Sequence, residues 1–444
     1  MTSKKIAFVS LGCAKNLCDT EVMLKKIADA GYEIVPEAEV ADAVVVNTCA
    51  FIEEAKRESI DTVLDLAWLK EHNGLKAIVV TGCMAERYRE ELLAELPEID
   101  AIVGVGSLDR IVDAVGTALG GKRGFSALDP KETCALGGDR IVTTGDAMAY
   151  LKIAEGCSNR CAYCAIPSIR GPLRSRKIED IVAEACDLDR MGIKELNVIA
   201  QDTSAYGIDL YGRYELPRLI NEITEKTRIP WIRLLYCYPD KITDGLVALL
   251  ATNDRVVKYI DIPIQHISDP VLRRMNRHGD AAMIKDAVRR LREAIPDIVL
   301  RTTLIVGFPG ETDEDFEELC RFVKEAEFDR LGAFTYSREE DTPAYDMEDQ
   351  VSESVKQKRY DVLMKTQLRI SEKKMRARVG KIYPVLCESF DPVAETYVGR
   401  TPAEAPDVDG KVFFTSDRPV NEGEIVDVKI TDSMDYDMVG ETVV

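Results

Sequence analysis

The sequence predicts a multidomain α/β protein: an N-terminal domain built on a parallel sheet, a central partial (β/α)6 barrel and a small C-terminal antiparallel β-barrel. Its 444 residues exceed one ordinary hydrophobic core, so two or three domains are expected. Apolar runs alternate with helical segments over most of the chain, whereas short strands separated by Gly, Pro and Asp turns fill its last part. We expect domains at residues 1–120, 148–371 and 372–444, with residues 121–147 as a linker.

Three apolar runs in the N-terminal domain each lead into a cysteine. The cysteines are Cys13, Cys49 and Cys83, and the runs before them span residues 6–12, 43–48 and 77–82. Continuous apolar runs separated by helices are typical of parallel strands covered on both faces, whose carboxyl ends meet at one edge of the sheet. The three thiols should therefore converge and form a metal site, because ligands bind at that edge. The alternative is that each cysteine is a small residue that closes a strand-to-helix turn.

A second set of cysteines lies within one short loop. Cys157, Cys161 and Cys164 follow a CxxxCxxC pattern among Gly, Ser and Asn residues. Three thiolates can hold three irons of a four-iron cluster and leave the fourth iron open to another ligand, which suggests chemistry at that iron. A zinc site would need a fourth Cys or His, and the nearest histidine in sequence, His72, is far away. The alternative is three buried thiols that pack like small hydrophobic residues.

The central domain contains six predicted strands, each followed by a helix. They span residues 149–154, 195–200, 231–236, 257–262, 299–306 and 330–335. Six successive βα units indicate a partial barrel with its active site at the carboxyl ends of the strands.

Polar residues follow three of these strands: Gln201 and Asp202, then Gln265 and His266, then residues 307–311. Each could instead be a turn residue or a helix cap. His266 and His278 fit hydrogen-bonded structural roles better than the role of a general base. Of Arg170, Arg174 and Arg176, which follow the CxxxCxxC loop, one could pair bidentately with a carboxylate of a cofactor or substrate.

Composition favours a cytoplasmic protein without a membrane partner. The chain is 46% hydrophobic and 31% charged, and its first apolar run is too short for a signal peptide. Twelve cysteines in such a protein fit metal ligands and reduced core residues better than disulfides. A net charge of −20 disfavours binding of free DNA or RNA, which depends on Lys and Arg neutralising phosphates. That charge favours a basic partner, or serves solubility alone.

The last domain is acidic although its strand pattern is typical of a small OB-like barrel. From Arg376 onward it holds seven Lys or Arg and fourteen Asp or Glu, a net charge of −7. An RNA-binding barrel would normally be basic. The sequence therefore favours a basic protein substrate for this domain.

The CxxxCxxC loop, with Tyr163 just before its last cysteine, resembles the radical S-adenosylmethionine (SAM) superfamily. The resemblance implies that SAM binds the open iron and that one electron from the cluster cleaves SAM to a 5'-deoxyadenosyl radical. It also implies a SAM site that includes Tyr163, Gln201, Asp202, Val306 and Gly307. No catalytic side chain is assigned beyond the cluster ligands.

The three domains together resemble the radical SAM methylthiotransferases, in which the C-terminal barrel is a TRAM domain. The resemblance implies two 4Fe-4S clusters, held by Cys13, Cys49 and Cys83 and by the CxxxCxxC loop. Residues 15–17, Lys-Asn-Leu, and residues 397–410 are similar to the branch that modifies the β-carbon of an aspartate in ribosomal protein S-twelve. Cys18 stands where that motif has an aliphatic residue, but Cys13 keeps the strand-end position.

Partners and alternatives follow from this resemblance. The partners are ribosomal protein S-twelve, alone or in the small ribosomal subunit, and a reductant such as flavodoxin or ferredoxin. The sister branch modifies an adenosine in transfer RNA, and a protein of another class would be a non-catalytic iron-sulfur electron carrier or ribosome accessory factor.

Overall fold

The computed structural model describes residues 3–133 and 136–443, which fall into two compact units. The first unit comprises Met1–Thr143, Ala154–Arg176 and Glu339–Tyr345. The second comprises Thr144–Ile153, Lys177–Arg338 and Asp346–Val444. The chain therefore passes from one unit to the other several times, and the predicted domain boundaries stay predictions.

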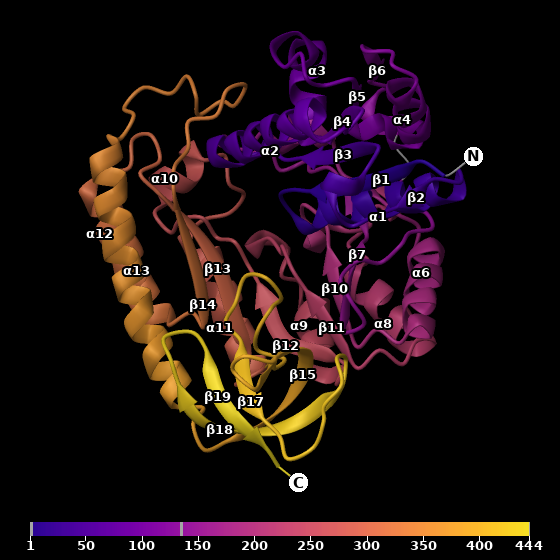
Figure 1. The fold of residues 1–444 in the computed structure, drawn as a ribbon. Coiled ribbons are helices and arrows are strands. Elements are labelled where there is room, and N and C mark those ends of the chain that lie inside the picture. The colour runs from indigo at the N-terminus through magenta and orange to yellow at the C-terminus, as the bar shows by residue number, and fades with distance from the viewer. Residues whose placement is uncertain (1–2, 134–135, 444) are drawn as a thin grey trace. The chain divides into compact units, whose positions relative to one another are not determined.

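The first unit is built on a six-stranded parallel sheet in the order β2-β1-β3-β4-β5-β6, as predicted for the N-terminal domain (Figure 1). The strands are β1 (Lys5–Ser10), β2 (Glu33–Ile34), β3 (Ala43–Thr48), β4 (Ala77–Gly82), β5 (Ala101–Val103) and β6 (Phe125–Ala127). The helices between them are α1 (Ala14–Asp29), α2 (Glu53–His72), α3 (Cys83–Glu95) and α4 (Ile111–Leu119), with 3-10 turns at Ala38–Val40, Val105–Arg110 and Lys131–Thr133. Strand β6 extends the sheet into the segment expected to be a linker.

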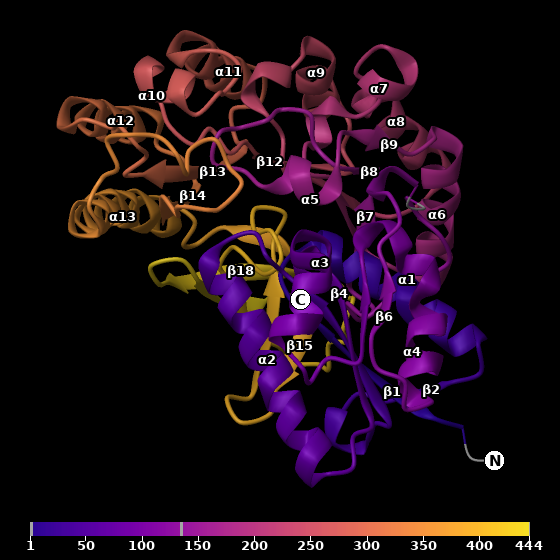
Figure 2. The same cartoon turned by 90° about the horizontal axis from the view of Figure 1, so that it is seen from above.

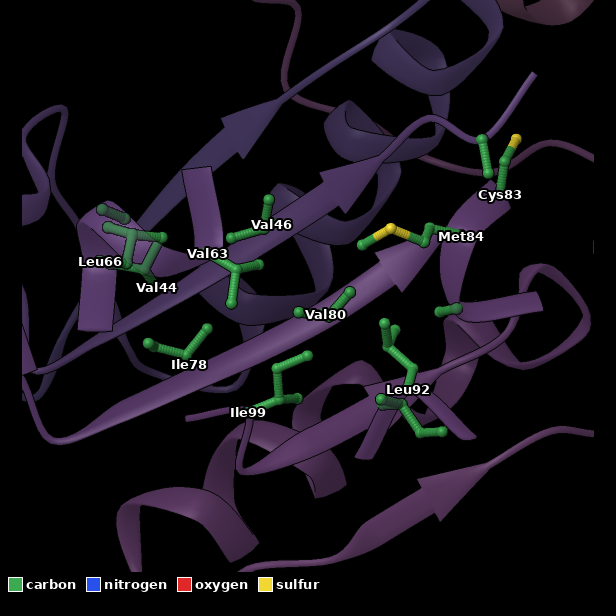
Figure 3. Packing of buried hydrophobic residues seen from close by; sticks show 14 of the residues in the cluster. Val44, Val46, Val63, Leu66, Ile78, Val80, Cys83, Met84, Leu92 and Ile99 are labelled. Atoms are coloured by element: carbon green, nitrogen blue, oxygen red, sulfur yellow. The ribbon is translucent and has the colours of Figure 1, made fainter. Parts of the chain in front are cut away.

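Both faces of this sheet are buried, which explains why its strands are continuously apolar. Met23 and Ile27 of α1 pack with Val45 and Val79 on one face, together with residues of α4. On the other face, residues of α2 and α3 cover β3 and β4, as Figure 3 shows. Cys83 follows directly at the end of β4 in that view. The core thus places the strand ends and the cysteines after them.

A short helix and a two-stranded hairpin complete the first unit. Helix α5 (Ile166–Arg170) lies between strands β8 (Ala154–Glu155) and β9 (Arg174–Ser175), which pair antiparallel. Ala165 and Ile169 belong to the same apolar cluster as Cys83. The segment that carries the CxxxCxxC loop is therefore part of the N-terminal core.

The second unit contains the predicted six-stranded sheet, in the order β14-β13-β12-β11-β10-β7, with all pairs parallel. Its strands are β7 (Met148–Lys152), β10 (Glu195–Ile199), β11 (Trp231–Leu234), β12 (Val256–Asp261), β13 (Val299–Val306) and β14 (Arg330–Thr335). All six predicted strands are confirmed.

Helices cover one side of this sheet and follow one another in an open arc (Figure 2). They are α6 (Ile178–Met191), α8 (Leu216–Lys226), α9 (Asp244–Thr252), α11 (Ala281–Ala294), α12 (Asp313–Ala326) and α13 (Glu353–Arg376), with the short α7 (Ile208–Tyr211) and α10 (Asp269–Arg274) and 3-10 turns at Thr203–Ala205 and Pro239–Lys241. The sheet does not close on itself, as expected for a partial (β/α)6 barrel.

The C-terminal strands form a closed five-stranded barrel in the order β15-β16-β17-β19-β18. They are β15 (Ile382–Asp391), β16 (Thr396–Arg400), β17 (Val412–Thr415), β18 (Ile425–Ser433) and β19 (Met438–Thr442). The sequence pattern indicates the first four as short segments at residues 382–386, 397–400, 411–414 and 424–430, whereas β19 was missed because an acidic stretch precedes it and its sequence is too short to signal a strand. Pairing with β17 and β18 makes it one.

Buried ion pairs fasten this barrel to the central sheet. Arg400 donates to Glu195 at 2.6 Å, and both side chains are buried. Glu404 accepts from Arg330 at 2.6 Å and from Arg378 at 2.5 Å. The acidic loop between β16 and β17 therefore turns some of the domain's negative charge inward, where no substrate can meet it.

In the part of the chain described, no helix is long and apolar enough to cross a membrane.

Candidate metal centres

The ends of β1, β3 and β4 place three cysteines at one edge of the N-terminal sheet. Cys13 caps the start of α1, Cys49 follows β3, and Cys83 begins α3. Cys13 is exposed, while Cys49 and Cys83 are buried. The parallel topology thus brings together the side chains that the sequence predicted to converge.

Glycines before two of these cysteines allow the close approach. Gly12 has φ of +86°, and an added Cβ would lie 2.7 Å from the Cβ of Cys49 and 3.0 Å from its sulfur. Gly82 has φ of +89°, and an added Cβ would lie 2.2 Å from Asn47 Oδ1. Both positions need a residue that adopts positive φ and carries no side chain. The loops at this edge are therefore shaped around the cysteines.

Asn16 holds two of the strand ends together from the first turn of α1. Its side-chain amide donates to the carbonyls of Leu11 and Thr48, both at 3.0 Å. Its Oδ1 lies 3.8 Å from the sulfur of Cys83. Asn16 is fully buried. It therefore links the backbone before Cys13, the backbone before Cys49 and the thiol of Cys83.

The three thiols influence one another's ionisation. Burial raises the pKa of Cys83 to about 12, and the neighbouring Cys13 and Cys49 act in the same direction. Burial, with a smaller contribution from Cys13, also raises the pKa of Cys49. Desolvation of its sulfur opposes ionisation of Cys13, although the residue as a whole is exposed, but Lys15, Arg170 and nearby backbone N–H groups lower its pKa.

This set of thiols fits a polycationic metal core better than three separate thiolates. Metal ligands must be deprotonated, and a cluster's irons would offset the burial and the mutual repulsion that oppose deprotonation here. Within residues 3–133 and 136–443, no three His, Cys, Asp or Glu side chains are arranged to bind a single metal ion. A cubane presents each thiolate to a different iron, so its ligands need not converge on one point.

The CxxxCxxC loop lies in the same compact unit as these three cysteines. Cys157 and Cys161 are buried and Cys164 is partly exposed. The N–H of Cys157 donates to the carbonyl of Gly171 at 3.0 Å, and the N–H of Cys164 to that of Cys161 at 3.0 Å. Asn159 Nδ2 lies 3.3 Å from the sulfur of Cys157. The loop is therefore folded by its own backbone hydrogen bonds.

A second segment of the first unit contacts this loop. Within Glu339–Tyr345, the N–H of Ala344 donates to the carbonyl of Ala162 at 2.8 Å. The Glu339 side chain lies 3.2 Å from Lys56 of α2 and 3.4 Å from Arg87 of α3. Glu339 is only 2% exposed. Residues 339–345 thus fasten the loop to the N-terminal helices.

Arg170 follows the loop and is buried against the N-terminal domain. Its guanidinium donates to Asp19 at 3.0 Å, to Glu155 at 2.9 Å and to Asn16 Oδ1 at 2.5 Å. The sequence left open that one of Arg170, Arg174 and Arg176 could pair with a carboxylate of a cofactor or substrate. Arg170 pairs instead with carboxylates of its own chain, because the core places both beside it.

Arg174 and Arg176 also belong to the first unit. Arg174 donates to the carbonyl of Glu132 at 2.9 Å. Arg176 is buried, with 7% of its surface exposed. Cys18 is buried on α1 with Arg140 Nη1 3.7 Å from its sulfur, whereas Cys13 occupies the strand-end position.

The predicted SAM contacts other than Tyr163 lie in the second unit, at the carboxyl ends of β10 and β13. Asp202 caps a 3-10 turn by accepting from the N–H of Ala205 at 3.1 Å, and it pairs with Lys241 at 3.1 Å. Gln201 precedes it directly and is partly buried. The structure gives Asp202 the helix-cap role that was its alternative, and its contact with SAM stays a prediction.

The loop after β13 is organised by Glu311, the last of residues 307–311 that follow the predicted fifth strand. Glu311 accepts from the N–H groups of Gly307 at 2.6 Å and Phe308 at 3.2 Å, and from Arg359 at 2.9 Å. Burial raises the pKa of Glu311 to about 7, while Arg359 and the two N–H groups favour its charged form. The carbonyl of Val306 accepts from Tyr336 at 2.9 Å. SAM binding by Val306 and Gly307 stays a prediction.

His266, one of the two histidines considered in the central domain, lies in the protein core. It is fully buried, its Nδ1 accepts from the N–H of Ser268 at 3.0 Å, and its Nε2 lies 3.9 Å from Glu311. Burial lowers the pKa of His266 to about 4. A buried, neutral and hydrogen-bonded imidazole fits a structural role for His266 better than the role of a general base.

Three family models match the chain in succession. Residues 5–104 match the model described as Uncharacterized protein family UPF0004, residues 151–323 the radical SAM superfamily and residues 379–443 the TRAM domain. The radical SAM methyltransferase TsrM of Kitasatospora setae, solved with cobalamin and a 4Fe-4S cluster, shares the fold with a TM-score of 0.59 at 15% identity, over 77% of each chain. Fold and cysteine pattern together define a radical SAM enzyme with 4Fe-4S clusters and SAM as cofactors.

Two relatives match over nearly their whole length. The ribosomal protein uS12 methylthiotransferase RimO of Acetivibrio thermocellus is 48% identical over 99% of this chain and 98% of its own. That of Geobacter sulfurreducens is 50% identical over 99% of both chains. This chain belongs to the family of ribosomal protein uS12 methylthiotransferases, as its first-domain and TRAM motifs predicted.

Proposed function

We propose that this protein replaces a hydrogen on the β-carbon of an aspartate in ribosomal protein uS12 with a methylthio group. The observation that carries the proposal is that Cys13, Cys49 and Cys83 share one compact unit with the CxxxCxxC loop. A carbon radical must meet its sulfur donor before it is quenched, so both sites must belong to one rigid frame. A non-catalytic electron carrier would need no such pairing with a SAM barrel.

Six cysteines would hold the cofactors. Cys157, Cys161 and Cys164 would bind one 4Fe-4S cluster, and the three strand-end cysteines would bind the other. When bound, the first cluster supplies the electron that cleaves SAM to a 5'-deoxyadenosyl radical, and the second carries the sulfur that receives a methyl group from another SAM. Asn16 orients the strand ends, and Glu311 fixes the backbone at Gly307 where we place SAM.

Charge supports a basic protein as the substrate. The chain has a net charge of −20, and the exposed acids of the TRAM domain include Asp391, Asp417, Asp427 and Asp432. Complementary charge speeds encounter with a basic partner and repels a free transfer RNA. Because Glu404 is buried in ion pairs with Arg330 and Arg378, only the outward acids serve this role. We place the reaction in the cytoplasm, with flavodoxin or ferredoxin as the class of reductant.

The test is mass spectrometry of the anaerobically reconstituted, reduced protein incubated with SAM and either uS12 or unmodified transfer RNA. A methylthio mass gain on an aspartate of uS12 is expected. The same gain on an adenosine would assign the chain to the transfer RNA branch. Formation of 5'-deoxyadenosine with neither product would refute the proposed transfer and leave only the radical SAM activity.

Cysteine variants separate the two metal centres. A protein with Cys13, Cys49 and Cys83 replaced by alanine should still cleave SAM to 5'-deoxyadenosine but give no methylthio product. A protein with the loop cysteines replaced should do neither. The matched control is Cys186→Ala, because Cys186 lies on α6 in the second unit, away from both cysteine sets in sequence. It should keep both activities.

A further inference from the structure

Arg170 stands at the junction between the CxxxCxxC loop and the three-cysteine edge of the N-terminal sheet. It ends α5, which begins two residues after Cys164 and packs Ile169 into the N-terminal core. Its side chain is 2% exposed. A guanidinium buried to this degree needs partners for its donors and its charge.

Those partners come from both sides of the junction. Glu155 precedes the CxxxCxxC loop, while Asp19 and Asn16 lie on α1 behind Cys13. The fork geometry of the guanidinium lets one side chain hold all three, which a lysine ammonium would hold less precisely. Through Asn16 the same chain of contacts reaches the carbonyls of Leu11 and Thr48.

The guanidinium also brings a buried positive charge close to the strand-end thiols. Asn16 Oδ1, which accepts from Arg170 at 2.5 Å, lies 3.8 Å from the sulfur of Cys83. A fixed positive charge beside a metal cluster stabilises the form that carries one more electron. Arg170 thus contributes both to the positions of the two cysteine sets and to the charge beside the strand-end cysteines.

We propose that Arg170 is a positioning residue that sets the relation between the two metal centres and raises the reduction potential of the N-terminal one. The proposal rests on the cluster assignment of the proposed function. Without Arg170, radical formation would continue, but capture of the substrate radical by sulfur would become inefficient because the two centres would no longer be held in register. The radical would then be lost to other reactions.

The first experiment measures the charge effect without turnover. In a full-length background with the three loop cysteines replaced by alanine, the electron paramagnetic resonance signal belongs to the N-terminal cluster. Arg170→Gln should lower the ratio of reduced to oxidised cluster at a fixed potential at least tenfold, equal to about 59 mV for one electron. Arg170→Lys, which keeps the charge, should stay close to the parent.

The second experiment measures coupling in the protein with both clusters. Arg170→Gln and Arg170→Lys should each lower the yield of methylthio-uS12 per 5'-deoxyadenosine at least tenfold, while 5'-deoxyadenosine formation per cluster stays within about threefold of wild type. The control is Arg174→Gln, which removes an arginine of the same segment that bonds the carbonyl of Glu132. It should leave the potential and the yield unchanged.

The results distinguish a failure of the inference about Arg170 from a failure of the proposed function. If the wild-type chain binds no second cluster, the proposed function fails before Arg170 is tested. If Arg170→Gln binds both clusters with unchanged potential and unchanged yield, the inference about Arg170 is wrong and the function stands. If Arg170→Gln does not take up iron, Arg170→Lys decides: a wild-type yield in that variant overturns the positioning role.

Discussion

Replacing Glu404 by glutamine should loosen the TRAM barrel from the central sheet at neutral pH. The carboxylate is fully buried, and it accepts from Arg330 and Arg378 on one oxygen. Its other oxygen accepts from the N–H of Thr401 at 3.1 Å and from the Thr401 hydroxyl at 2.5 Å. Glutamine keeps the shape but loses the charge, so two buried cations lose their counter-ion.

The size of the effect follows from the carboxyl's ionisation. Burial alone would raise the pKa of Glu404, but Arg378, Arg330 and Thr401 lower it from 4.5 to about 2. That difference corresponds to about 3 kcal/mol of stability at pH 7. Removing one partner of a buried ion pair costs about 3–5 kcal/mol of stability, and the value from the pKa difference lies at the lower end of this range.

The stabilising effect of the Glu404 carboxylate should depend on pH. The stabilisation is fully present above the unfolded pKa of 4.5 and is lost as the pH falls toward 2, because protonation then removes the charge. The difference between wild type and Glu404→Gln should therefore be constant from pH 7 to about 5 and shrink below pH 4.5.

The assay is urea unfolding of the iron-free chain in a Trp68→Phe background. The chain has two tryptophans, and Trp231 begins β11 in register with Glu195, the partner of Arg400, so its fluorescence then reports on the second unit. The control is Glu424→Gln, whose partner Arg418 is exposed, and which should change stability little. A loss below about 1 kcal/mol at pH 7, or a loss that persists unchanged at pH 3, would refute the ionic account.

Three further perturbations test other parts of the molecule. Gly12→Ala should lower bound iron by about half, because the added Cβ would meet Cys49 at 2.7 Å; full iron content by chemical analysis would contradict this. The double variant Asp427→Asn, Glu441→Gln should raise the KM for uS12 several-fold at low salt and leave kcat unchanged, since both acids are exposed. Kinetics at low and high salt measure this effect, and a KM that does not depend on salt would count against it. Glu339→Gln should speed hydrogen exchange of its segment, because two buried cations lose their partner; unchanged exchange by mass spectrometry would oppose it.

The strand positions could be predicted because they depend on local apolar runs. The three runs before Cys13, Cys49 and Cys83 and the six strands of the central sheet were all identified from periodicity. Strand β19 was missed because only its neighbours β17 and β18 make it a strand. Strand β6 was missed for the same reason, as the sixth strand of a sheet whose partner β5 is itself short.

The strand-end positions of Cys13, Cys49 and Cys83 could be predicted, whereas the residues around them could not, and the role of these cysteines as ligands stays a prediction. The three cysteines follow apolar runs at equivalent strand ends, and this repetition is visible in a single sequence. The contacts of Arg170 with Asp19 and Glu155 join residues remote in sequence, and no local pattern marks them. The charge count of the TRAM domain likewise could not reveal that Glu404 points inward.

The composition of the first unit has a consequence for how the protein is made and altered. Because this unit needs Ala154–Arg176 and Glu339–Tyr345 in addition to the N-terminal segment, its fold cannot be completed on the ribosome until residue 345 has been synthesised. A chimera that exchanges only the first 120 residues with a relative would combine the sheet of one protein with the two later segments of another. A functional exchange between branches must transfer all three segments together.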